Sequence, residues 1–498
     1  MDVTSIWFLP FLTITLALHS LSLRRAWRIG VLLLSSCVFV AWSAPSVMAL
    51  CPLAGFAILG FGLIRMAGAT QIPLAVNVIA AIAAFAYLKQ YSILPLKALL
   101  SYPYMTVGLS YILFRVLHLI IDVRQGEVKK NIGIIDYFFY IICFFNFLSG
   151  PIQRYQEFFE ETKGPSPITD SSARQGLCRI ASGYAKVIVL SPLIKNGFDN
   201  VAAMAATWPA GGDFFGNLLT WFCPELSPGP FYHEAILVAE FAAAIPMYML
   251  FLYINFSGYM DIVVGCGKLF GYHIPENFDH PLNSGNMLEF WSRWHITLST
   301  WFKIYLFNPL LRLLTSWTKN PKHAQYFAVL SFFVTFLIMG IWHGTTYVYI
   351  VYGVFLGAGV SLNKLYQTLF VKTFGRSRYN ALCRSWIYQN TSRTMTLSYF
   401  SISLLCLWNS AEELKNTLLS LSTHGSISVI CGIHLLLFMI LPLYDGLCRL
   451  FTVLSQRLAS VVGTAIATTV WTAANALCAI YFALAQISSV PAFIYKGF

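Results

Sequence analysis

The chain has 498 residues, of which 57% are hydrophobic and only 10% are charged. A soluble domain needs roughly 25% charged residues to cover its surface, so this composition, with a mean hydropathy of +0.67, excludes an ordinary water-facing globule. The 32 Lys and Arg residues outnumber the 20 Asp and Glu residues, which gives a net charge of +12. In a membrane protein this excess is typical of cytoplasmic loops and of attraction to membrane lipid, so we set nucleic acid aside as a partner.

Long apolar runs recur along the whole chain, and each crossing needs about 20 residues. The first, 6–23, is followed at once by Arg24, Arg25 and Arg28, which predicts a cytoplasmic end. The sequence predicts an all-α, polytopic protein with ten to twelve crossings, re-entrant and interfacial helices, and a central tunnel. It shows no internal repeat, so we expect a single membrane domain over 1–498. The later runs lie at about 30–49, 51–64, 71–88, 105–123, 134–150, 183–196, 235–267, 326–342, 345–363, 394–411, 427–447 and 462–490.

The distribution of basic residues predicts the orientation. No Lys or Arg occurs between Lys195 and Lys268, so the Gly-, Pro- and Trp-rich loop at 207–232 should lie outside. Segments 268–323 and 364–393 are rich in basic residues and should lie inside. If 134–150 crossed completely, the basic stretches around it would fall on opposite sides, so we expect this segment to be re-entrant.

Residues 288–306 read as one amphipathic helix with an aromatic face. His295 and Ser299, one turn apart, fall at the margin of that face, where polar groups could point into a cavity. An interfacial helix with a solvated histidine explains the same pattern.

His343 is the stronger functional candidate. It lies in Gly340-Ile341-Trp342-His343-Gly344, which we expect to form the turn between an outward limb, 326–342, and a returning limb, 345–363. An imidazole at membrane depth is costly and usually faces a bundle interior or a water-filled path. The flanking glycines allow a tight turn or the close approach of another chain or a ligand.

Two further clusters carry polar groups near the membrane. Ser149-Gly150-Pro151-Ile152-Gln153-Arg154-Tyr155 ends an apolar run with an arginine, which is either a snorkelling side chain or a phosphate clamp. Asp261 lies in a span without nearby basic residues, so it should find a partner on another segment. The eleven cysteines form no CxxC pair, and we expect neither a metal nor a tightly bound cofactor.

Four ordered motifs within 105–365 together resemble the membrane-bound O-acyltransferase superfamily. They are Ser149-Gly150-Pro151-Ile152-x-Arg154-Tyr155; Phe256-Ser257-Gly258-Tyr259-x-Asp261 leading to Pro275-Glu276-Asn277-Phe278; Phe290-Trp291-x-Arg293-Trp294-His295-x-x-Leu298-Ser299; and Gly340-x-Trp342-His343-Gly344. The chain is similar to the bacterial branch that holds alginate O-acetylation proteins and D-alanyl-lipoteichoic acid transferases, and Ser-Gly-Tyr-x-Asp resembles the alginate side more. Where the family often has an acidic residue after a basic one, Lys303-Ile304-Tyr305 stands here.

The resemblance implies an acyltransferase core over 105–365 and C-terminal spanning helices over 366–498. It implies that His343 and His295 are catalytic, with His343 as the general base. The substrate or tunnel would contact Trp291, Arg293, Trp294, Ser299, Trp342, Asp261 and Arg154.

The reaction implied is acyl transfer, most simply of an acetyl group. The donor would be a cytosolic thioester, acetyl-CoA or an acyl carrier's phosphopantetheine, and the acceptor a hydroxyl on an extracytoplasmic glycan or an esterase-like acetyltransferase partner. The location implied is the bacterial cytoplasmic membrane. One alternative is D-alanyl transfer to teichoic acid. A multi-span transporter or flippase is an alternative of another class, although we find none of the inverted repeats that transporters often show. A structural membrane scaffold is a third alternative, disfavoured by histidines and an aspartate at lipid depth.

Overall fold

The computed structural model describes residues 7–69, 72–92, 106–163, 168–207, 230–318, 323–408, 410–420 and 423–485, with a few isolated positions between them. Within these ranges the fold is all-helical, as predicted, and the one extended pairing is an isolated bridge between Phe278 and Trp294. Most of the loop at 207–232, predicted to lie outside, falls beyond the described residues.

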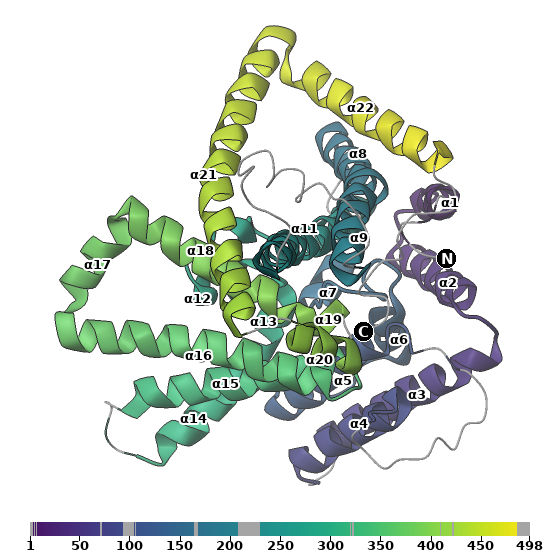
Figure 1. The fold of residues 1–498 in the computed structure, drawn as a ribbon. Helices are drawn as coiled ribbons and strands as arrows, with labels where there is room; N and C mark the ends of the chain where they lie inside the picture. The colour runs from purple at the N-terminus through teal and green to yellow at the C-terminus, as the bar shows by residue number, and fades with distance from the viewer. Residues whose placement is uncertain are drawn as a thin grey trace.

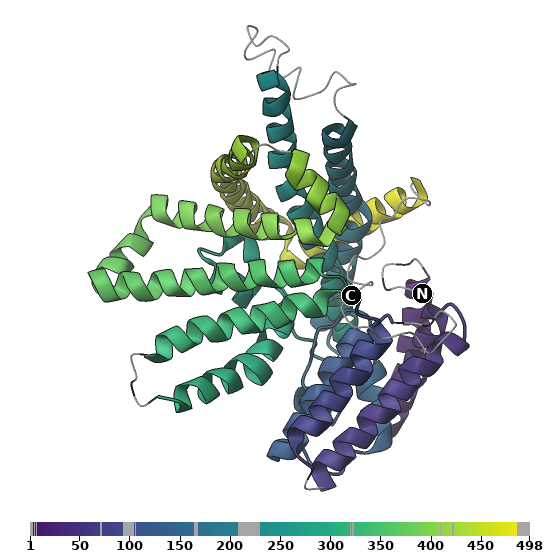
Figure 2. The same ribbon diagram turned by 60° about the horizontal axis from the view of Figure 1, so that its bottom comes forward.

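The N-terminal third forms a layer of helices along one side of the molecule (Figures 1 and 2). Helix α5 is its most buried member and packs against both α3 and α4. The elements of this part are α1 (Phe8–Ser20), α2 (Arg25–Ser43), η1 (Met48–Leu50), α3 (Cys51–Ala69), α4 (Leu74–Lys89), α5 (Leu109–Gln125), α6 (Ile134–Ile142) and α7 (Tyr155–Lys163).

The centre is a pair of long antiparallel units, which lie side by side in Figure 1. One runs through α8 (Asp170–Tyr184), the π-helical segment η2 (Ala185–Leu190) and α9 (Ser191–Thr207), and the other is α11 (Pro230–Phe270). Their backbones approach closely through glycines: a Cβ on Gly183 would lie 2.6 Å from the carbonyl oxygen of Gly258. Small residues permit such crossings between membrane helices.

The short elements that follow α11 lead into a helical hairpin. They are η3 (Pro281–Asn283), α12 (Met287–Arg293), α13 (Ile296–Phe302), the π-helical segment η4 (Lys303–Phe307) and α14 (Asn308–Ser316). The hairpin consists of α15 (Ala324–His343) and α16 (Val348–Phe374), the outward and returning limbs that the sequence predicts. Its helices lie side by side in Figures 1 and 2.

The C-terminal part returns across the molecule. Helices α18 and α21 both pack against α11 and against each other, and α18 also contacts α16. The far end of α21 and the helix α22 reach the edge of the molecule in Figure 1. The elements are α17 (Arg376–Arg384), α18 (Trp386–Ser403), α19 (Leu405–Trp408), α20 (Ala411–Ser420), α21 (Thr423–Val462) and α22 (Thr464–Ala485).

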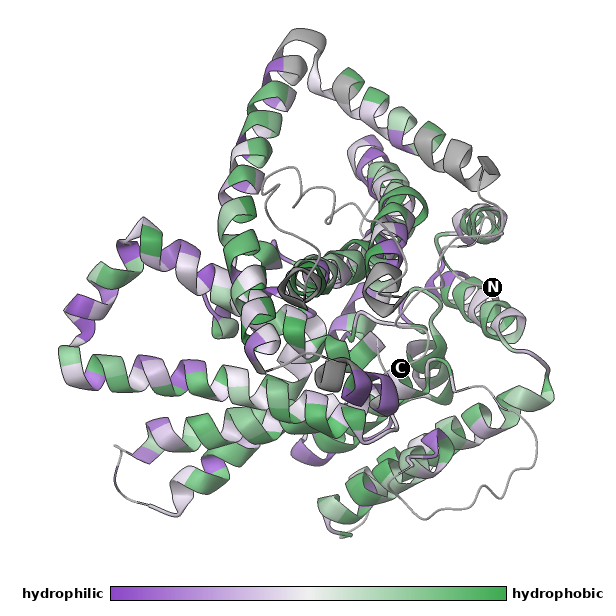
Figure 3. Cartoon of the chain, in the orientation of Figure 1, coloured by the Kyte–Doolittle hydropathy of each residue, from purple (hydrophilic) through white to green (hydrophobic). Residues whose placement is uncertain are grey.

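Apolar residues make up much of the length of the helices, as the colouring in Figure 3 shows. Large aliphatic side chains such as Leu34, Ile79 and Leu435 are mostly exposed. Seven helices within the described residues are long and apolar enough to cross a membrane, and α1 and α4 are shorter apolar helices. These features define a multi-pass membrane protein. The count of ten to twelve crossings stays a prediction.

Residues 134–150 do not form a spanning helix. Helix α6 has nine residues, about 14 Å at 1.5 Å per residue, against a hydrocarbon core of about 30 Å. The chain then continues without regular helix and stays buried. The fully buried guanidinium of Arg115 donates to the carbonyls of Tyr140, Ile141 and Asn146. These backbone carbonyls at and after the end of α6 therefore have hydrogen-bond donors although they are buried. This geometry agrees with the expectation that 134–150 does not cross.

Candidate active site

The prediction of a single amphipathic helix over 288–306 is wrong, because the helix is interrupted at His295. Helix α12 ends at Arg293, α13 begins at Ile296, and His295 between them has a left-handed φ of 46°. The break is held by pairing with the loop after α11: the Ile296 amide donates to the Asn277 carbonyl at 3.0 Å. Helical periodicity did not reveal this break because the aromatic spacing continues through it.

Asn277 fixes the hydrogen-bonding state of His295. The backbone N–H of Thr297 donates to Asn277 Oδ1 at 3.1 Å, so that atom is an acceptor, and it lies 3.3 Å from Nδ1 of His295. His295 Nδ1 must therefore carry a proton. In a neutral imidazole, the lone pair is then on Nε2.

Thr297 joins three of the sequence motifs. Its hydroxyl donates to Asn277 Oδ1 at 2.8 Å and accepts from the amide of Ile152 at 3.0 Å. The Gly150-Pro151 motif, the loop around Asn277 and the helix break at His295 are consequently one connected unit.

His343 is the last residue of α15, and the connection to α16 follows it at 344–347, so the predicted turn lies slightly later in the chain. Its Nδ1 lies 2.6 Å from the carbonyl oxygen of Met339. A carbonyl can only accept, so Nδ1 donates and the lone pair of the neutral ring lies on Nε2. Gly340 has a packing role, because a Cβ there would lie 2.1 Å from Cα of Gly353 on α16.

The two histidines are both buried. His295 is 1% exposed and His343 is 4% exposed. Burial lowers the pKa of His295 to about 3, and a charge on His343 would lower it further. Desolvation disfavours the imidazolium form, so His295 is neutral near pH 7.

A cavity of about 340 Å³ lies between the helices that carry the histidines. Trp291 and Ser299 lie in its wall, as does Met339, whose carbonyl binds His343. Exposed polar residues, Ser292, Thr300 and Lys303, line another part. The remaining lining is apolar apart from Thr335, and it comes from Leu288, Ile296, Phe302, Phe307, Phe332, Phe336 and Val360.

The aromatic candidates surround this region. Trp291 packs against Phe336, with ring centroids 4.9 Å apart, and Trp342 lies 4.9 Å from the ring of His343. Trp294 is buried among aromatic rings, including that of Phe290 at 5.5 Å. Among the described residues, neither Nε1 of Trp291 nor Nε1 of Trp342 has a hydrogen-bond acceptor, although both are buried. Of the two, Trp291 lines the cavity, whereas Trp342 lies next to His343 and does not line it.

Three predicted site residues take part in ion pairs. Arg293 pairs with Glu289 at 2.9 Å on its own helix. Arg154 pairs with Asp122 at 3.2 Å. Asp261 finds the partners that the sequence requires on another segment: Arg179 at 2.8 Å and Lys186 at 2.6 Å. Asp261 lines a different cavity from the one next to Met339, so the structure does not group it with Trp291 and Ser299.

Sequence reasoning missed the parts that Asn277 and Thr297 play. Asn277 belongs to the second of the four motifs, but nothing in its spacing shows a contact with His295, 18 residues later. Arg115 was also missed. An arginine inside the apolar run at 105–123 was the available signal, because such a charge needs buried acceptors.

The fold and the site define a multi-pass membrane protein with two buried histidines next to elements that line one cavity. Residues 231–408 match the model of the membrane-bound O-acyltransferase family, and they include both histidines. This match covers about a third of the chain and identifies that segment as one of the membrane-bound O-acyltransferase type.

The chain is similar to two kinds of bacterial protein. It is 25% identical over 380 residues to "Probable alginate O-acetylase AlgI" of Pseudomonas putida, covering 72% of this chain and 70% of that protein. For the Pseudomonas aeruginosa protein of the same name these values are 25%, 72% and 65%. It is 30% identical over 259 residues to "Teichoic acid D-alanyltransferase" of Streptococcus thermophilus, covering 52% of this chain and 56% of that protein. The chain thus spans about two thirds of the alginate relatives and about half of the teichoic acid relative.

Proposed function

We propose that this protein moves an acyl group, in the first instance acetyl, from a cytosolic thioester to a hydroxyl on an extracytoplasmic glycan or relay protein. The observation that carries the proposal is the burial of His295 and His343 next to elements that line one cavity, in the segment that matches the membrane-bound O-acyltransferase family. Neither imidazole lines this cavity, and its lining includes the exposed residues Ser292, Thr300 and Lys303. The bacterial relatives support a location in the cytoplasmic membrane.

His343 is the general base of the proposed reaction. Its Nε2 accepts the proton of the acceptor hydroxyl while the hydroxyl oxygen attacks the acyl carbon. The carbon–sulfur bond then breaks, and the imidazolium returns the proton to the leaving thiolate. Proton transfer of this kind typically contributes about 10²–10⁴ in rate.

His295 and the two indoles orient the acyl group. The hydrogen bond from Nδ1 of His295 to Asn277 fixes its ring, and the N–H groups of Trp291 and Trp342 are donors for the acyl carbonyl oxygen. A donor in a water-excluded site stabilises the developing oxyanion more than it would in water. The polar part of the 340 Å³ cavity, at Ser292, Thr300 and Lys303, is where the donor would enter.

The first experiment supplies the purified, reconstituted protein with labelled acetyl-CoA and measures hydroxyl-linked product. Ser299→Phe should block the cavity and reduce transfer at least tenfold. Ser455→Phe, which enlarges an exposed serine on α21, is the matched control and should retain activity. Equal activity in both variants would contradict the assignment of this cavity to the donor.

D-alanyl transfer from a carrier protein to teichoic acid is the second candidate, favoured by the 30% identity to the Streptococcus thermophilus protein. A parallel assay with a D-alanyl carrier protein separates the two. Product only in that assay would replace acetyl by D-alanyl and leave the histidine roles intact. Movement of the intact donor across the membrane without an ester product would instead indicate a transporter.

A further inference from the structure

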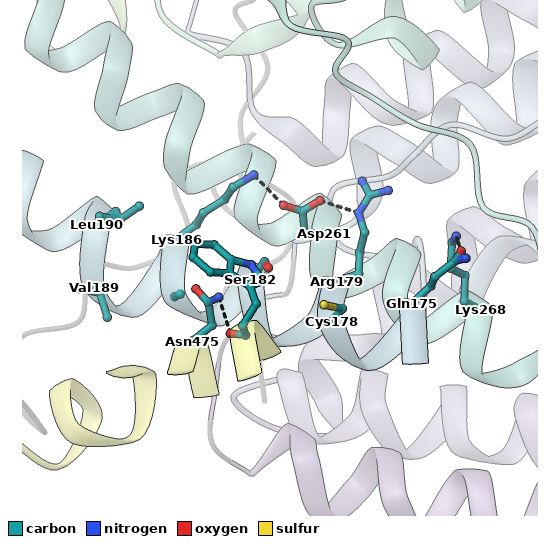
Figure 4. A pocket seen from close by; sticks show the side chains of 12 residues that line it. Gln175, Cys178, Arg179, Ser182, Lys186, Val189, Leu190, Asp261, Lys268 and Asn475 are labelled. Atoms are coloured by element: carbon teal, nitrogen blue, oxygen red, sulfur yellow. Dashed lines mark hydrogen bonds and ion pairs between the residues drawn. The ribbon is translucent and has the colours of Figure 1, made fainter. Parts of the chain in front are cut away.

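A second, larger cavity lies along α8 and η2 and is bordered by α11 and α22. Its volume is about 750 Å³, and Figure 4 shows its side chains converging from α8, η2, α11 and α22. None of its lining residues lines the cavity beside the histidines. It is lined by Gln175, Cys178, Arg179, Ser182, Ala185, Lys186, Val189, Leu190, Asp261, Lys268, Trp471 and Asn475.

The charged groups in this cavity are predominantly positive. Asp261 is shared by Arg179 and Lys186, as Figure 4 shows. The guanidinium of Arg179 also makes two contacts with Glu276, at 2.5 and 2.7 Å. Lys268 is a third cation, and its ammonium donates at 3.0 Å to the neutral amide of Gln175. Three cations thus face two carboxylates, which leaves a positive charge at the Lys268 end.

The lining changes from charged to apolar along one helical stripe. Gln175, Arg179 and Lys268 lie at one end and Val189 and Leu190 at the other, an arrangement visible in Figure 4. Gln175 and Val189 are 14 residues apart, which corresponds to about 20 Å along a helix. The charged end lies where α8 begins and α11 ends, next to the segment 268–323 that the sequence predicts to be cytoplasmic. A ligand that fits this cavity has an anionic head and an apolar tail.

We propose that this cavity binds a phospholipid with an anionic headgroup from the inner leaflet. The phosphate lies near Lys268 and Arg179, and an acyl chain follows Val189 and Leu190 toward the membrane centre. Basic pockets between membrane helices on the cytoplasmic side recognise anionic headgroups, and the apolar part of the cavity distinguishes a lipid from a free phosphate. This inference does not depend on the proposed acyl transfer.

The test measures lipid binding directly on the full-length, detergent-purified protein. Native mass spectrometry during titration with phosphatidylglycerol, phosphatidylcholine or inorganic phosphate gives an affinity for each. The wild type should bind phosphatidylglycerol at least tenfold more tightly than phosphatidylcholine and should not retain inorganic phosphate.

Two variants locate the site. Lys268→Gln should weaken phosphatidylglycerol binding at least tenfold, because it removes the one cation of the cavity that no carboxylate pairs with in the described part of the chain. Ser182→Phe should abolish the bound lipid by filling the cavity. Lys303→Gln, an exposed lysine beside the other cavity, is the matched control and should bind as the wild type does. Unchanged affinity in both Lys268→Gln and Ser182→Phe would overturn the proposal, as would retention of inorganic phosphate with equal binding of the two lipids.

Discussion

Asn277 Oδ1 accepts a hydrogen bond from His295 Nδ1 at 3.3 Å while the amide and hydroxyl of Thr297 donate to the same oxygen. This arrangement determines which nitrogen of His295 carries the proton. The carbonyl of Met339 likewise determines that Nδ1 of His343 carries the proton. Both buried imidazoles therefore have Nε2 as the basic nitrogen, which is the state that the proposed reaction needs.

Replacing Asn277 tests this control of the tautomer. Asn277→Ala removes the shared acceptor, so we expect a loss of about 1–3 kcal/mol in stability and at least a tenfold loss of acyl transfer. Asn277→Asp keeps an acceptor but adds a negative charge, which favours the imidazolium form of His295. In this variant the acid limb of the rate profile should move to higher pH. Identical pH profiles for wild type and Asn277→Asp would show that Asn277 does not act through His295.

The depressed pKa of His295 predicts a pH dependence of stability. The unfolded chain protonates this residue below about pH 6.5, whereas the folded chain resists protonation until about pH 3. The unfolded state binds more protons within this window, so stability falls as the pH falls, by up to about 1.4 kcal/mol per pH unit.

The measurement compares apparent melting temperatures between pH 7 and pH 4 at one scan rate. Acidification should lower the value for the wild type more than for His295→Asn, which lacks the titrating group. His323→Asn, at an exposed histidine, should behave as the wild type does. Parallel curves for wild type and His295→Asn would mean that His295 is not held neutral by the fold.

The buried indoles predict an effect on the rate without loss of the fold. Trp342→Phe and Trp291→Phe keep a six-membered aromatic ring but remove the pyrrole part of the buried indole with its unpaired N–H, so each should also lose about 0.5–3 kcal/mol of stability. If either N–H binds the acyl oxygen in the transition state, its loss should reduce kcat by about 10²–10³. Trp294→Phe is the control within the same aromatic cluster. Wild-type kcat in both test variants would exclude the indoles as oxyanion donors.

Composition and hydropathy were sufficient to predict the all-helical membrane fold, the hairpin of α15 and α16, and the need of Asp261 for a basic partner. These features depend on burial of apolar surface and of charge, which a single segment reveals. The break at His295 could not be predicted, because its cause is a loop 18 residues earlier that supplies Asn277. The close contact of Gly340 with Gly353 also depends on a second helix. The sequence therefore predicted a turn at Gly340, where the structure has close packing between α15 and α16.

His343 carries the proposed proton transfer, and the rate of acyl transfer from labelled thioester by His343→Ala is the decisive measurement of its role. The variant should reach the membrane and purify as the wild type does, with a rate reduced by about 10²–10⁴. His434→Ala, at a half-exposed histidine on α21, is the matched control and should keep the wild-type rate. A His343→Ala protein that transfers the acyl group at the wild-type rate would contradict the account.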